Sequence, residues 1–89
     1  MREVHMLAQI VITSDLRYFL TQYNAKRIRQ GDKPLTLRQV ARETGIALST
    51  LTGLTTNRAQ GIQFETLSTL CSYFNCLPSD ILRYTPDEE

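Results

Sequence analysis

The chain has 89 residues, of which 42% are hydrophobic and 21% charged, and its formal net charge is only +1. This length allows one small domain with a modest core, and the hydrophobic fraction is too high for a disordered chain. Two cysteines are too few for a disulfide scaffold. The sequence also has no run of about 18 apolar residues to span a membrane and no leader with a small-residue cleavage site. We therefore expect one soluble, cytoplasmic domain.

The first thirteen residues form an apolar arm. A period-2 pattern runs through it, with apolar side chains at Val4, Met6, Ala8, Ile10 and Ile12, but the intervening positions are also largely apolar. The pattern fits either a short strand or an arm that leads into a helix. An exposed apolar strand tends to associate with other chains, so residues 1–13 are the first candidate for a dimer contact.

A first helix is predicted after Ser14, a residue type that favours the helix N-cap. Apolar residues then recur at the spacing i, i+3, i+4 and i+7, which is typical of one helical face. Ile28 extends this face, and the polar segment 29–34, with its glycine and proline, predicts a loop. The residues of the face are Leu16, Phe19, Leu20 and Tyr23.

The start of the second helix carries the sharpest local signal. Thr36 and Gln39 fit a capping box, in which the hydroxyl accepts from the third amide and the glutamine side chain reaches back to the cap. The helix is therefore predicted to begin at Leu37. Gly45 follows only eight residues later and predicts a left-handed residue that ends the helix.

Three further helices are predicted in the second half of the chain. One runs from Leu48 to Thr56, a second begins near Phe64, and a short last one opens at Pro78, where the missing N–H does no harm. The periodicity assigns five residues of these helices to the core, whereas Leu48 fits either the core edge or a binding surface. The predicted core residues are Leu51, Leu54, Phe64, Leu67 and Phe74.

Charge is distributed unevenly along the chain. Residues 16–58 carry eight basic side chains against two acidic ones, whereas residues 59–89 carry one basic and five acidic side chains. Such asymmetry predicts one basic face, as nucleic-acid-binding domains have. The chain lacks a nucleophile–base pair, a glycine-rich phosphate loop and a carboxylate cluster. Cys71 and Cys76 have no histidine nearby. We therefore expect no enzyme, no metal and no cofactor.

Residues 37–54 resemble the Cro/repressor (Xre-type) helix-turn-helix DNA-binding domain family. The resemblance to its compact bacterial and phage members continues through residues 61–82. It implies an all-α, five-helix, lambda-repressor-like fold for the DNA-binding domain at 14–85. Residues 1–13 lie outside the pattern and add a short N-terminal strand or arm, and residues 86–89 are expected to form an acidic tail. The residues that carry the motif are Ala41, Gly45, Ile46, Leu51 and Leu54.

The resemblance also assigns residue roles. The helix from Leu48 would lie in the major groove, with base contacts from Leu48, Ser49, Thr50 and Gly53. Phosphate contacts would come from Arg38, Thr55, Asn57 and Arg58. The first turns of this helix lack Arg, Lys, Asn and Gln, so bidentate base contacts worth about 1–3 kcal/mol each are missing there. Sequence specificity would then be weak, or it would rest on DNA shape and on Arg58.

The function implied is sequence-specific binding of double-stranded DNA by a transcriptional regulator, acting as a repressor or autoregulator in the cytoplasm of a bacterial host. A homodimer on a palindromic site is expected. The second candidate for the dimer contact is the face around Tyr73, Ile81 and Tyr84. The alternative is a protein-interaction module on the same scaffold, such as an antitoxin or an adaptor subunit.

Overall fold

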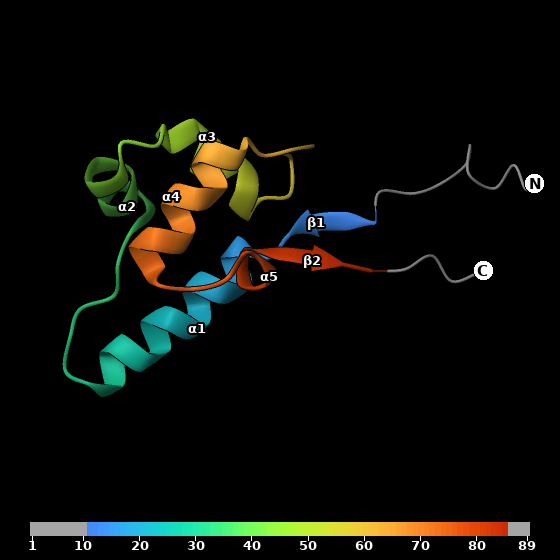
Figure 1. Cartoon of the computed structure of the whole chain (residues 1–89). Helices are drawn as coiled ribbons and strands as arrows, with labels where there is room; N and C mark the ends of the chain where they lie inside the picture. Colours follow the sequence, from blue (N-terminus) through green and yellow to red (C-terminus); the bar gives the residue numbers. More distant parts are fainter. Residues whose placement is uncertain (1–10, 86–89) are drawn as a thin grey trace, which may run out of the picture.

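The computed structural model describes residues 11–85, and this part of the chain contains five helices and one two-stranded sheet (Figure 1). The predicted all-α, five-helix fold is confirmed. Of the two alternatives for the N-terminal segment, a strand or an arm that leads into a helix, the structure has a short strand at residues 12–14. The expected tail at 86–89 and most of the expected arm lie outside the described residues. The elements are β1 (Ile12–Ser14), α1 (Leu16–Arg29), α2 (Leu37–Thr44), α3 (Leu48–Thr55), α4 (Phe64–Phe74), α5 (Pro78–Ile81) and β2 (Leu82–Tyr84).

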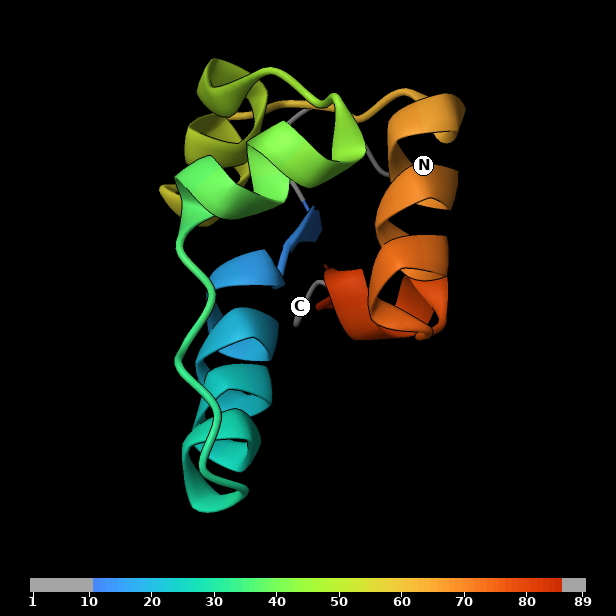
Figure 2. The ribbon, with the colours of Figure 1, turned by 90° about the vertical axis from the view of Figure 1, so that its left-hand side faces the viewer.

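Helix α1 buries only the first part of its predicted apolar face. The Ser14 hydroxyl oxygen accepts from the backbone N–H of Leu16 at 3.1 Å, although Asp15 occupies the N-cap position itself. Leu16 is buried, and the rest of the predicted face packs against the core. The extension to Ile28 is wrong, because this side chain is 58% exposed. Figure 2 shows why: the C-terminal part of α1 runs beyond the other helices.

Polar contacts hold the loop after α1 against the helix. The Asn24 amide pairs with Leu35 in both directions, donating to its carbonyl at 3.0 Å and accepting from its N–H at 2.8 Å. The Arg27 guanidinium donates to the Lys33 carbonyl at 2.8 Å. These bonds satisfy backbone groups of an exposed loop and fix the point from which α2 starts.

Helix α2 begins and ends as the sequence predicts, but only half of the capping box forms. The Thr36 hydroxyl oxygen accepts from the N–H of Gln39 at 3.1 Å, and Gly45 ends the helix in the left-handed region at φ 79°. The prediction that the Gln39 side chain returns to the cap is wrong. It donates instead to the Glu43 carboxylate one turn ahead, at 3.1 Å.

The core lies where α3 and α4 meet the other elements. Of the predicted core residues, Leu51, Leu54 and Phe74 are buried and Leu67 is partly buried against them. The prediction that Phe64 belongs to the core is wrong, because its side chain is 87% exposed. It is the first residue of α4, and the side of the helix that faces the core begins one turn later. The buried residues are Leu16, Leu35, Val40, Leu51, Leu54, Leu70, Phe74 and Ile81.

Phe74 joins α1 to α4 through aromatic contacts. Its ring meets those of Phe19, Tyr23 and Tyr73 edge to face, with centroid separations of 5.2, 4.9 and 4.9 Å. This is the geometry that aromatic quadrupoles favour. Because Phe74 is the last residue of α4, the cluster also fixes the point at which the chain turns into α5.

The ends of the described chain meet in the two-stranded sheet. β1 and β2 pair antiparallel with Ile12 opposite Tyr84, Thr13 opposite Arg83 and Ser14 opposite Leu82. The Asp15 N–H continues the pairing by donating to the Ile81 carbonyl at 2.7 Å. Figure 1 shows this ribbon projecting from the helices. The expectation that Ile81 lies on a dimer face with Tyr73 and Tyr84 is wrong, because Ile81 is fully buried in the core.

A hydrogen-bonded brace ties α2 to α4. The Tyr73 hydroxyl donates to one Glu43 carboxylate oxygen at 2.6 Å, and Gln39 donates to the other. These two bonds, the tyrosine's first, hold the pKa of Glu43 below its ordinary 4.5. Partial burial, with the bond to Glu43, raises the pKa of Tyr73 to about 12. The brace thus adds a direct side-chain link between α2 and α4.

The brace predicts a pH-dependent contribution to stability. A carboxyl whose pKa is lowered in the folded state stabilises the protein fully above pH 4.5, and this contribution is lost as the pH falls through the folded-state pKa. Tyr73→Phe should therefore lower the free energy of unfolding at neutral pH, and the difference from the original protein should shrink below pH 4.5. Urea titrations at pH 7 and pH 3 measure this. Tyr18→Phe, at an exposed tyrosine, is the control, and an equal deficit at both pH values contradicts the brace.

Candidate nucleic-acid interface

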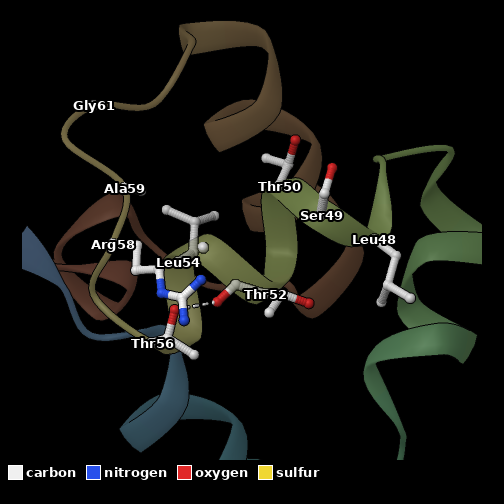
Figure 3. A pocket seen from close by; sticks show the side chains of 10 residues that line it. Leu48, Ser49, Thr50, Thr52, Leu54, Thr56, Arg58, Ala59 and Gly61 are labelled. Atoms are coloured by element: carbon white, nitrogen blue, oxygen red, sulfur yellow. Dashed lines mark hydrogen bonds between the residues drawn. The ribbon is translucent and has the colours of Figure 1, made fainter.

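The outer face of α3 is defined by the side that the core takes. Leu51 and Leu54 point into the core, which leaves the opposite side of the helix outward. Ser49, Thr50 and Thr52 are exposed on this side (Figure 3). An exposed helix face of hydroxyls and methyl groups, with no acidic residue, suits the edges of bases and the thymine methyl in a major groove.

The outer face of α3 and the loop that follows it enclose an open hollow. Figure 3 shows the side chains that line it, with Ser49 and Thr50 at one end and Arg58 beside the last turn of the helix. All four predicted base-contact residues lie here, together with one predicted phosphate contact. Leu48 is half-buried at the edge of this surface. The lining consists of Leu48, Ser49, Thr50, Thr52, Gly53, Leu54, Thr56, Arg58, Ala59 and Gly61.

The first turn of α3 is left open at its N-cap. Ala47 occupies the cap position and offers no side-chain acceptor. The first N–H groups of a helix have no partner within the helix, and their dipoles give this end a partial positive charge. The start of α3 therefore combines free donors with the hydroxyls of Ser49 and Thr50.

The last turn of α3 fixes Arg58. Asn57 adopts a left-handed conformation at φ 60°. The N–H groups of Arg58 and Ala59 both donate to the Gly53 carbonyl, at 3.0 and 3.1 Å. The bond from Arg58 is the six-to-one bond of a Schellman motif, which ends a helix sharply. These bonds fix the backbone of Arg58, and its exposed side chain lies beside the last turn of the helix (Figure 3).

The residues predicted to contact phosphates differ in whether their side-chain hydrogen-bond donors are free. The Thr55 and Thr56 hydroxyls already donate to the Thr52 carbonyl, at 3.1 and 2.8 Å. A phosphate oxygen only accepts hydrogen bonds, so Thr55 would have to release this carbonyl before it could donate to DNA. The side chains of Asn57 and Arg58 are exposed.

A second hollow extends the surface towards α1. It brings Arg17 and Thr21 of α1 next to Thr55 and Asn57. The charge pattern of the sequence gives no reason to single out Arg17 among the basic residues of α1 as a DNA contact. The fold does, because it places Arg17 beside the end of α3. Arg38, the fourth predicted phosphate contact, is exposed on the first turn of α2 and lies apart from both hollows.

Comparison with known proteins agrees with this geometry. The model of the Cro/C1-type HTH DNA-binding domain matches residues 24–87. The chain belongs to the Cro/C1-type helix-turn-helix family. It is also 30% identical over 57 residues to the uncharacterized HTH-type transcriptional regulator YozG of Bacillus subtilis (strain 168), covering 64% of this chain and 68% of the relative. No solved structure matches the chain.

The family assignment confirms the predicted resemblance to a DNA-binding helix-turn-helix domain of transcriptional regulators. The Cro/C1-type domain is a DNA-binding module and not an enzyme family. Within residues 11–85, no group of three or more His, Cys, Asp or Glu side chains is arranged to hold a metal ion. None of the helices in that range has the length and apolar character needed to cross a bilayer.

Gly53 allows stability and DNA affinity to be separated. A Cβ at this position would lie 3.9 Å from Ala59, an ordinary contact, so alanine fits the fold. Gly53→Ala should raise the free energy of unfolding by about 0.5–1 kcal/mol, because glycine is a poor helix former. The added methyl should weaken DNA binding if Gly53 lies against the duplex. Thermal melts and a binding titration measure the two effects, and unchanged affinity in the more stable variant contradicts close approach at Gly53.

Proposed function

We propose that this protein is a sequence-specific regulator of transcription that binds duplex DNA through α3 and acts as a repressor or as a regulator of its own gene. The observation that carries the proposal is the exposed, uncharged outer face of α3 with Arg58 held beside its last turn. Bases need an unencumbered helix face, and the backbone needs a fixed cation at the border of that face. A cytoplasmic location, on the nucleoid when bound, belongs to this proposal.

In this proposal, base recognition falls to the first half of α3. Ser49 and Thr50 hydrogen-bond to base edges, and Leu48 packs on a thymine methyl. Gly53 lets the helix approach the groove. Hydroxyls pair with several bases, so much of the sequence preference comes from the shape and flexibility of the DNA.

Affinity comes mainly from phosphates. Arg58 and Asn57 contact the backbone at one end of α3, and Arg38 contacts it from the first turn of α2. Thr55 joins them after its hydroxyl leaves the Thr52 carbonyl. Arg17 lies close enough to this end of α3 to add a further contact.

The proposed active form is a homodimer. One small domain covers a limited stretch of DNA, and twofold symmetry doubles the contacts on a palindromic site. We assign the dimer contact to the arm at residues 1–13 and the DNA contact to the domain at 14–85, with 86–89 as an acidic tail. β1 crosses the boundary between arm and domain.

Removing the Arg58 cation tests the DNA-binding surface. Arg58→Ala should weaken binding to a specific and a random duplex alike and reduce the salt dependence by about one phosphate contact. Arg83→Ala is the matched control. Arg83 is also exposed, and its 3.9 Å ion pair with Asp15 is too solvated to hold the fold. Fluorescence anisotropy at several salt concentrations gives both slopes.

Two outcomes would contradict the proposed surface. One is an identical salt slope for Arg58→Ala and the original protein. The other is no binding to duplex DNA at low salt, which would favour the alternative of a protein-interaction module on this scaffold, such as an antitoxin or an adaptor.

A further inference from the structure

The β1–β2 ribbon carries an apolar face that nothing covers within residues 11–85. Ile12 and Tyr84 are directly opposite each other, so their side chains lie on the same face of the ribbon. They are 56% and 66% exposed. β1 pairs with β2 along one edge, and an isolated two-stranded ribbon is only marginally stable. Large apolar side chains on such a projecting ribbon indicate a contact surface.

An apolar slot adjoins this face. A cavity of about 130 Å³ lies between β1 and the loop after α3. Its apolar lining includes Ile12, Leu54, Ile62 and Leu82. An engineered apolar cavity of about 150 Å³ takes up benzene, so this slot has room for one apolar side chain.

The sequence ahead of the ribbon fits the face and the slot. Ten residues precede the described chain, and an extended strand of that length would reach about 33 Å. The residues in the same alternation as Ile12 are all apolar from position 4 onward: Val4, Met6, Ala8 and Ile10. Such a segment offers one fully apolar side to a sheet edge and to a slot of this size.

We propose that a second copy of this chain docks on the ribbon, with residues 1–10 of each copy pairing antiparallel with β1 of the other. The incoming strand extends the sheet at the free edge of β1, so that its apolar side continues the face of Ile12 and Tyr84 and one of its apolar side chains enters the slot. Because the exchange is reciprocal and antiparallel, each copy makes the same contact, as a twofold dimer requires. This inference rests on the homodimer of the proposed function and names its interface.

The proposed interface touches the DNA-binding surface. The slot shares Leu54, Ala59 and Gly61 with the hollow on α3. A side chain from the second copy would therefore pack beneath the loop that carries Arg58. The dimer contact thus fixes the spacing between the two α3 helices and holds the phosphate-binding loop in place.

The test compares two double variants of the full chain by light scattering over a range of concentrations. Ile12→Thr with Tyr84→Thr removes the ribbon's apolar face. Ile28→Thr with Tyr18→Thr changes the same residue types at sites of similar exposure on α1, 58% and 62%. We expect twice the 10.2 kDa chain mass for the original protein and for the α1 variant. The ribbon variant should dissociate with at least a tenfold higher Kd.

A third variant keeps the inference testable if the ribbon variant loses its helical circular dichroism. Ala8→Asp with Ile10→Asp leaves residues 11–85 unchanged and should also dissociate the dimer. The inference is overturned if the original protein is monomeric, or if both variants stay dimeric. An anisotropy titration of the same samples separates the two proposals, because a monomer that binds duplex DNA leaves the DNA-binding function standing. A dimer without DNA binding removes that function and keeps the interface.

Discussion

Two leucines determine where α3 lies, and the candidate interface depends on them. Leu51 is fully buried and Leu54 is 3% exposed, although the helix that carries them has only eight residues. A helix of this length is marginal on its own, and α3 has neither a side-chain cap nor a charged residue in its terminal turns. Packing against the core therefore keeps α3 in place. The same packing turns Ser49 and Thr50 outward.

The two ends of α3 are built differently, and the proposed function uses this difference. The first turn is uncapped and carries short hydroxyl side chains, which suits base edges of more than one kind. The last turn is closed by the bond from the Arg58 N–H to the Gly53 carbonyl, which fixes the backbone from which an exposed cation projects. A surface of this kind gains affinity from phosphates and selectivity from groove shape.

Local signals in the sequence were sufficient for much of the fold. Thr36 and Gly45 bound α2 through chemistry confined to a few residues, and the structure confirms both ends. Long-range packing was harder to predict. Phe64 satisfies the helical period, but it precedes the turn at which α4 reaches the core. Pairing of β1 with β2 joins opposite ends of the chain, and no pattern within either strand indicated its partner.

The site was predictable in outline because the helix-turn-helix spacing fixes which side of α3 faces outward. Thr52 and Thr56 also line the hollow, because they follow Ser49 by three and seven residues and so lie on the same side of the helix. This spacing is visible in the sequence. The position of Arg17 beside Thr55 depends on how α1 crosses α3. The hydrogen bond from the Thr55 hydroxyl to the Thr52 carbonyl likewise follows from the folded geometry and from no pattern in the sequence.

In the proposed function, α3 and the loop that follows it hold duplex DNA. The most direct measurement is a two-dimensional nitrogen–proton NMR titration of the labelled protein with a duplex from its own upstream region. The account predicts that the largest amide shifts fall within residues 48–58 and at the start of α2 around Arg38. It is contradicted if those amides stay unchanged while the duplex shifts signals elsewhere, or if no signal moves at low salt.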